Sequence, residues 1–138
     1  MPDLPNVGHT VSFSKTVAES DLVAFAQVSG DDQPLHLDDT FGERTRFGKR
    51  IAHGMLSAAF ISAVLGTKLY PSGIVIYLGQ SLQFRRPVHI GDTITAHAEV
   101  LTVDASKNVV TLRTDCTNQE GETVTRGEAT VMLDDLKS

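Results

Sequence analysis

The stretch that decides the fold reads HGMLSAAFISAVLGTK and spans residues 53–68. Its apolar side chains recur at helical spacing, while the residues on its other sides are small and weakly polar. The recurring set is Met55, Leu56, Ala59, Phe60, Ala63 and Val64. A helix that is apolar nearly all round lies inside a protein. We therefore expect a long central helix over about 53–68.

Four strands are expected after this helix. Beyond the Pro-Ser-Gly turn at 71–73, the chain is rich in Val, Ile and Thr and is divided by Gly, Asp and Asn turns. The strand-like segments are 74–84, 93–103, 109–118 and 123–133. No helical crossover separates them, so neighbouring strands are expected to pair antiparallel through hairpins.

The segment before the central helix supplies a fifth strand and a further helix. Residues 9–17 alternate apolar and polar side chains, which predicts a strand. Thr16 and Glu19 stand at the spacing of a capping box, which predicts a helix over 19–28 with Gly30 just beyond its end. The expected fold class is α+β, with a curved antiparallel five-stranded sheet wrapped around the central helix.

Length and composition limit the classes of function. A chain of 138 residues with 41% hydrophobic content is expected to form a single domain over 1–138. It has no apolar run of membrane-spanning length and no leader-like N-terminus, so we expect a cytoplasmic protein with no membrane partner. A net charge of -5 argues against a nucleic-acid partner. An anionic ligand would need a local basic cluster, and the candidates are Arg44, Arg46, Lys49 and Arg50, and Arg85 with Arg86.

The segment most informative about chemistry is SGDDQPLHLD, residues 29–38. Asp31 and His36 stand five residues apart across a turn stiffened by Pro34, so both side chains can face one small space and hold a water molecule between them. A carboxyl group and an imidazole, with ordinary pKa values of about 4 and about 6.5, can share the proton movements of a water addition. The alternative is that Asp31 caps a turn and His36 has no catalytic role.

A second feature is the sequence Ala-His-Gly-Met at 52–55, where the central helix begins. The first backbone N–H groups of a helix are unpaired and carry partial positive charge. A glycine at Gly54 lets a carbonyl oxygen approach them closely, which favours a site that polarises a thioester. The alternative is that Gly54 only allows close packing of the loop against the helix.

These segments together resemble the MaoC-like (R)-specific enoyl-CoA hydratases. Residues 29–38 are similar to the hydratase motif of that family, written S-G-D-x-N-P-[LIV]-H-x-D, with Gln33 in the place of the asparagine. Residues 51–55, IAHGM, and residues 84–94, FRRPVHIGDTI, resemble the helix entry and the sheet turn of the family. With the order of elements, the resemblance covers nearly the whole chain.

The resemblance implies a hot-dog fold, a homodimer and an acyl-CoA thioester as substrate. We expect no cofactor and no metal. It also implies residue roles. Asp31 and His36 are the expected catalytic pair, and the backbone of Gly54 is the expected oxyanion donor. Ser62 is a candidate supporting hydroxyl near the catalytic water, chosen from its helix position. Candidate substrate-binding residues are His53, Arg85 and Arg86.

The expected reaction is reversible hydration of trans-2-enoyl-CoA to (R)-3-hydroxyacyl-CoA, with Asp31 as the base and His36 protonating C2. Two other functions stay open on the sequence: a 3-hydroxyacyl-ACP dehydratase, and a non-catalytic hot-dog module that binds thioesters. A hot-dog thioesterase is less consistent, because the loop from Asp31 to His36 would have no purpose. A metal site of His36, Asp38 and His53 has the residue types but no ligand-spacing motif.

Several residues receive no catalytic role. Cys116 lies in a strand-like segment without a paired histidine, so a structural role is expected. His9, His89 and His97 fall in or beside strands and are expected to be solvated or cross-strand side chains. Acyl-chain length and pathway, whether polyhydroxyalkanoate supply, fatty acid oxidation or fatty acid synthesis, cannot be read from the sequence.

Overall fold

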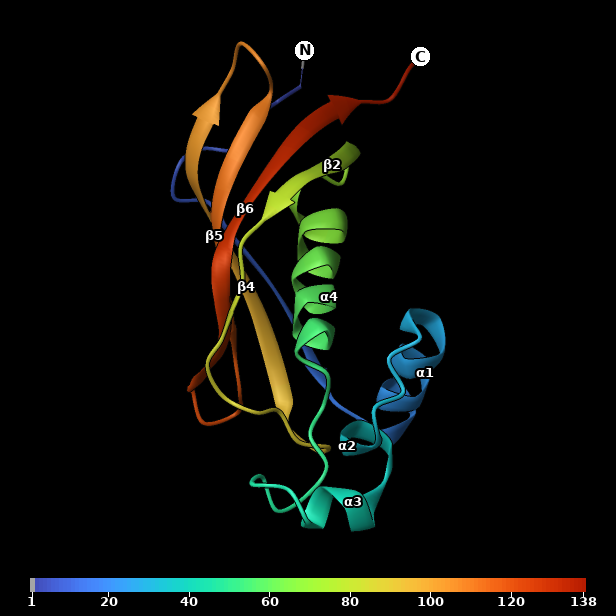
Figure 1. The fold of residues 1–138 in the computed structure, drawn as a ribbon. Helices are drawn as coiled ribbons and strands as arrows, with labels where there is room; N and C mark the ends of the chain where they lie inside the picture. Colours follow the sequence, from blue (N-terminus) through green and yellow to red (C-terminus); the bar gives the residue numbers. More distant parts are fainter. Residues whose placement is uncertain (1) are drawn as a thin grey trace.

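One curved antiparallel sheet and one long helix form the body of the protein. The computed structural model describes residues 2–138. Figure 1 shows α4 lying along one face of the sheet, with α1, α2 and α3 gathered beyond the N-terminal end of α4 and both chain termini at the opposite end. The helices are α1 (Glu19–Ser29), α2 (Pro34–Leu37), α3 (Asp39–Glu43) and α4 (Gly54–Val64), and α4 continues as a π-helical turn, η1 (Leu65–Leu69).

Five long strands make up the sheet in the order β1-β4-β5-β6-β2, and the short β3 pairs with β6 beside them. The strands are β1 (Thr10–Thr16), β2 (Gly73–Gln80), β3 (Gln83–Phe84), β4 (Thr93–Asp104), β5 (Val109–Thr117) and β6 (Thr123–Asp135). All pairings are antiparallel. The predicted α+β hot-dog architecture is confirmed.

One pairing differs from the sequence expectation. The hairpins β4-β5 and β5-β6 form as predicted, but β2 pairs with β6 and not with the strand that follows it in the chain. The predicted strand 74–84 is also divided into β2 and β3. Alternation of side chains identifies a strand but carries no information about its partner, because any strand with the same period fits the same pleat.

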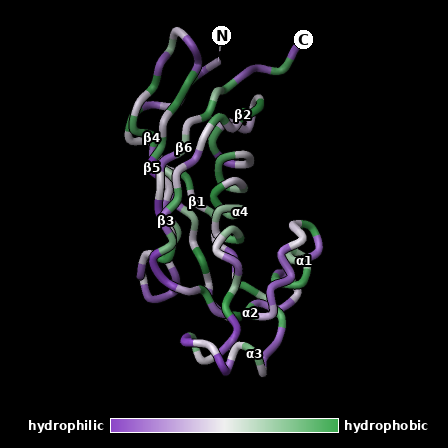
Figure 2. The backbone as a smooth tube through the Cα atoms, viewed as in Figure 1, coloured by the Kyte–Doolittle hydropathy of each residue, from purple (hydrophilic) through white to green (hydrophobic). Residues whose placement is uncertain are grey.

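The core lies between α4 and the concave face of the sheet, where α4 packs against β1, β4, β5 and β6. Alternate strand residues point at the helix, as the burial of Ala96, Ala98, Val100, Val110 and Leu112 shows. Helix residues Phe60, Ile61 and Val64 meet them. In Figure 2 the tube of α4 is mostly coloured as hydrophobic, which matches this position.

The central helix is nevertheless not buried all round in the single chain. Met55, Ala59 and Ser62 recur at helical spacing on a stripe that is exposed, and Met55 is 53% exposed. The expectation of complete burial was therefore wrong for this stripe. Among the helices of residues 2–138, none is long and apolar enough to cross a membrane.

Helix α1 shows both a correct and an incorrect prediction of helix ends. Gly30 adopts the left-handed conformation, φ 83°, and ends the helix as expected. The predicted capping box is wrong, because the hydroxyl of Thr16 bonds across the sheet to Thr93. The first turn is instead closed by Asp21, whose carboxylate accepts a hydrogen bond of 2.8 Å from the backbone N–H of Ala18.

Candidate active site

In the loop after α1, Asp31 precedes a short turn and His36 follows it. The backbone N–H of Asp31 donates to Ser29 Oγ at 3.1 Å, and the Asp31 carboxylate accepts from the backbone N–H of Gln33 at 3.4 Å. Pro34 then starts α2, where its fixed φ suits the first helical position. The expected loop therefore contains a helical turn, and His36 lies on it.

The tautomer of His36 follows from its contacts. Its Nδ1 lies 2.7 Å from the backbone carbonyl of Ile51, and a carbonyl only accepts, so Nδ1 carries the proton. The amide nitrogen of Gln33, which only donates, approaches His36 Nε2 at 3.5 Å. In the neutral ring, Nε2 of His36 therefore has a lone pair. The side-chain amide of Gln33, which replaces the shorter asparagine of the family motif, extends as far as the imidazole ring.

Asp31, His36 and His53 form one cluster. A carboxylate oxygen of Asp31 and a ring nitrogen of each histidine lie within 4.8 Å of one another. This separation suits one bridging water molecule, because each of its hydrogen bonds spans about 2.8 Å. The structure therefore brings together the two residues that the sequence pairs.

His53 contacts both members of that pair. Its ring stacks on His36 with centroids 3.8 Å apart and planes at 25°. Its Nε2–H donates to the backbone carbonyl of Asp31 at 2.8 Å. His53 is buried, and its Nδ1 is one of two buried side-chain nitrogens that have no partner within residues 2–138. The sequence predicts a substrate contact for His53. It does not indicate that His53 packs against His36 and bonds to the backbone of Asp31.

The cluster also has residue types that ligate metals, but its geometry favours hydrogen bonding. Imidazole binds a metal in the plane of its ring, and two rings stacked at 25° do not converge on one point. Moreover, Nδ1 of His36 and Nε2 of His53 are each engaged with a backbone carbonyl. Asp38, the third ligand of the metal site considered from the sequence, instead accepts from the backbone N–H of Phe41 at the start of α3.

Arg50 stabilises the loop that carries His36 through a hydrogen bond to its backbone, a contact that the sequence did not indicate. Its Nε donates to the backbone carbonyl of His36 at 2.9 Å, and its Nη1 bonds to Glu19 at 2.8 Å and to Asp39 at 3.5 Å. Arg50 is only 7% exposed. Its expected membership of a basic cluster open to an external anion is wrong, because the guanidinium is buried and its Nε and Nη1 bond to groups of the protein.

Replacement of Arg50 by Met should lower the free energy of unfolding by about 2 kcal/mol, because the carbonyl of His36 loses a charge-assisted hydrogen bond in a buried setting. Urea denaturation measures this change. Asp39→Asn is the matched control, since Asp39 is exposed and such a pair contributes less than about 0.5 kcal/mol. Equal stability of Arg50→Met and the wild type would contradict the supporting role.

A cavity of about 430 Å³ opens at the N-terminus of α4. Gly54 is the first residue of the helix and lies on the cavity wall, so its backbone N–H has no partner within the helix. A Cβ at this position would lie 2.9 Å from the ring of Phe84. Ile51, whose carbonyl binds His36, lines the same cavity and links it to the catalytic cluster.

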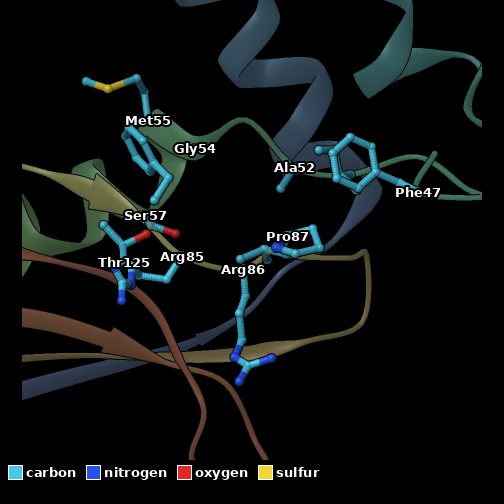
Figure 3. A pocket seen from close by; sticks show the side chains of 12 residues that line it. Phe47, Ala52, Gly54, Met55, Ser57, Arg85, Arg86, Pro87 and Thr125 are labelled. Atoms are coloured by element: carbon cyan, nitrogen blue, oxygen red, sulfur yellow. The ribbon is translucent and has the colours of Figure 1, made fainter. Parts of the chain in front are cut away.

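The remaining wall combines cations, hydroxyls and apolar rings. Figure 3 shows Arg85 and Arg86 on one side of the cavity, with Ser57 and Thr125 beside each other below Gly54. Arg86 pairs with Glu122 at 3.3 Å on the surface. Both arginines line the cavity, and the substrate contact expected for them stays a prediction.

Residues 4–121 match the MaoC like domain family. The chain belongs to the MaoC-like family. It is 51% identical over 126 residues to an (R)-specific enoyl-CoA hydratase of Rhodospirillum rubrum, covering 91% of this chain and 86% of that protein. The solved (R)-hydratase of A. caviae involved in PHA biosynthesis superposes with a TM-score of 0.90 at 42% identity, over 96% of this chain and 99% of that one.

A third relative differs in its carrier. The mitochondrial 3-hydroxyacyl-[acyl-carrier-protein] dehydratase of Arabidopsis thaliana is 33% identical over 136 residues, which is 96% of this chain and 80% of that protein. The MaoC-like family thus includes relatives named for CoA thioesters and relatives named for carrier-protein thioesters.

Two further residues of this MaoC-like chain can now be placed. Ser62 lies on the exposed stripe of α4, while the hydroxyls at the described part of the cavity wall belong to Ser57 and Thr125. The supporting role expected for Ser62 stays a prediction. Cys116 is fully buried, its thiol donates to the backbone carbonyl of Ser57, and burial raises its pKa to about 12. A protonated, inaccessible thiol is not a nucleophile.

Proposed function

We propose that this chain is an (R)-specific enoyl-CoA hydratase, which adds water to trans-2-enoyl-CoA and catalyses the reverse dehydration. The observation that carries the proposal is the Asp31–His36 pair, held at a separation that one water molecule bridges. Ile51, whose backbone carbonyl accepts a hydrogen bond from His36, lines the cavity at the N-terminus of α4, although Asp31 and His36 are not themselves among the residues that line it. The relatives described above carry the names of this reaction and its reverse.

In this mechanism the water molecule donates one hydrogen to the Asp31 carboxylate and the other to His36 Nε2. Asp31 removes a proton as the water oxygen bonds to C3, and the electrons of the double bond move toward the thioester oxygen. Because Nε2 carries a lone pair in the neutral ring, His36 protonates C2 only after Nε2 has received a proton. The new C3 hydroxyl still bridges the pair, so it takes the proton back from Asp31 as it passes its own hydrogen to Nε2. His36 then delivers this proton to C2, and both residues return to their starting states.

Further residues have proposed roles around this step. The Gly54 N–H stabilises the negative charge on the thioester oxygen, because it is unpaired and belongs to the positive end of α4. Ser62 supports the catalytic water, and Arg85 and Arg86 meet the phosphate groups of CoA, since guanidinium groups match phosphate geometry. Water and proton reach the substrate from one side, so addition is syn. The (R) configuration is inferred from the relatives.

We also propose that the chain acts as a cytoplasmic homodimer in which residues 1–138 form one domain. β2 is an edge strand, and its Ile74, Tyr77 and Leu78 are exposed apolar side chains. The exposed stripe of α4 adds further apolar area that a second copy would cover. Sedimentation equilibrium at micromolar concentration should give twice the mass of the chain. The A. caviae protein is involved in PHA biosynthesis. We propose that this chain likewise supplies (R)-3-hydroxyacyl-CoA for the synthesis of polyhydroxyalkanoate.

The second candidate function is 3-hydroxyacyl-ACP dehydratase, which the Arabidopsis relative favours. Both functions use the same acid–base pair, so they differ only in the carrier. Loss of the ultraviolet absorbance of the conjugated thioester, followed with crotonyl-CoA and with crotonyl-ACP, compares them directly. Higher kcat/KM with the CoA thioester supports the proposal, and higher kcat/KM with the ACP thioester replaces it. Binding of both thioesters without turnover would make the chain a non-catalytic module.

A further inference from the structure

Two hydroxyl groups in the cavity are not used by the mechanism above. Ser57 and Thr125 are 3% and 2% exposed, and both line the cavity. Ser57 comes from α4 and Thr125 from β6, and Figure 3 shows them side by side below Gly54. Because both side chains line the cavity, their hydroxyls can form hydrogen bonds with polar groups of a ligand.

The position of Ser57 relative to Gly54 indicates what the hydroxyls bind. Residues three apart lie on the same side of a helix, about 4.5 Å apart along its axis. On the proposed function, the thioester oxygen lies at the Gly54 N–H. The next polar group toward the carrier is the amide two methylene carbons beyond sulfur, whereas a trans-2-enoyl chain has no polar atom beyond the thioester.

We propose that Ser57 and Thr125 form a subsite for the first amide of the pantetheine arm. A hydroxyl donates and accepts, so two hydroxyls satisfy both the N–H and the carbonyl of one amide. The apolar rings of Phe47 and Phe84, which line the same cavity, suit the methylene groups of the arm. Arg85 and Arg86 at the rim suit its phosphate end. This inference rests on the proposed function and adds two specificity residues to it.

Saturated butanoyl thioesters test the subsite without turnover. Isothermal titration compares the N-acetylcysteamine thioester, which has the first amide only, with the S-butyl thioester, which has none. For the Ser57→Ala/Thr125→Val double variant we expect Kd for the first ligand to rise by about 5- to 50-fold, since each hydrogen bond contributes about 2- to 10-fold. The Kd of the S-butyl thioester should stay within about twofold.

Thr111→Val is the matched control, because the Thr111 hydroxyl bonds to Thr102 on the outer face of the sheet, away from the cavity. Circular dichroism reports whether each variant folds, and both substitutions keep the side-chain shape or the helix propensity. An equal rise in Kd for both thioesters, or none for either, would overturn the subsite, as would a wild type with no preference for the amide. Failure of the proposed function is a separate result, namely no hydration of crotonyl-CoA by the wild type.

Discussion

Asp31→Asn is expected to lower kcat for crotonyl-CoA hydration by about 100-fold or more while changing KM little. Asn keeps the size of the side chain and an oxygen that can accept the hydrogen bond from the Gln33 N–H. It removes the carboxylate that takes the proton from water, and loss of one acid–base partner typically has this magnitude. Steady-state kinetics with the purified variant measure the effect.

The adjacent carboxylate provides a matched control for this prediction. Asp32 is exposed, its backbone N–H bonds to Gly30, and it is not part of the cluster that contains Asp31, His36 and His53. Asp32→Asn makes the same chemical change one residue away, so near-native kcat is expected. A near-native Asp31→Asn, or an inactive Asp32→Asn, would show that the assignment of the base is wrong.

Gly54→Pro should lower kcat by about 100- to 1000-fold, because proline has no N–H to stabilise the developing oxyanion. The helix itself should tolerate this change. Gly54 is the first residue of α4, where proline is favoured, and His53 already has the extended conformation (φ -58°, ψ 134°) that a residue before proline requires.

Gly54→Ala separates the lost N–H from the added side chain. Both variants place a Cβ against the ring of Phe84, which is 53% exposed and can move. Only the proline variant loses the donor. We expect Ala to reduce kcat at least tenfold less than Pro, with the difference in kcat and not in KM. If the two variants lose the same activity, the role of Gly54 is steric.

The elements predicted most closely from the sequence were those set by local patterns. The apolar spacing of residues 53–68 identified α4, and a glycine at Gly30 marked the end of α1, because each signal lies within one element. The pairing of β2 with β6 was missed, since side-chain alternation does not select a partner. The motif also paired Asp31 with His36, which the structure brings together.

The residues that support the site were harder to predict. The burial of Arg50 could not be predicted, because the groups that it bonds to lie 11 to 31 residues away in the chain. No local sequence pattern indicates contacts of this kind. His53 was recognised as part of the helix entry, yet its stacking on His36 depends on how the loop folds back. Ser57 had one readable signal: it is three residues after Gly54 and therefore on the same side of the helix.

The most direct test of the account is chiral analysis of the 3-hydroxybutyryl-CoA that the wild-type protein forms from crotonyl-CoA. The proposed function predicts rapid hydration and a single enantiomer, because one acid–base pair delivers water and proton from one side of the substrate. The names of the relatives make the expected enantiomer (R). A racemic product, the (S) enantiomer, or no hydration of crotonyl-CoA or of longer enoyl thioesters would contradict it.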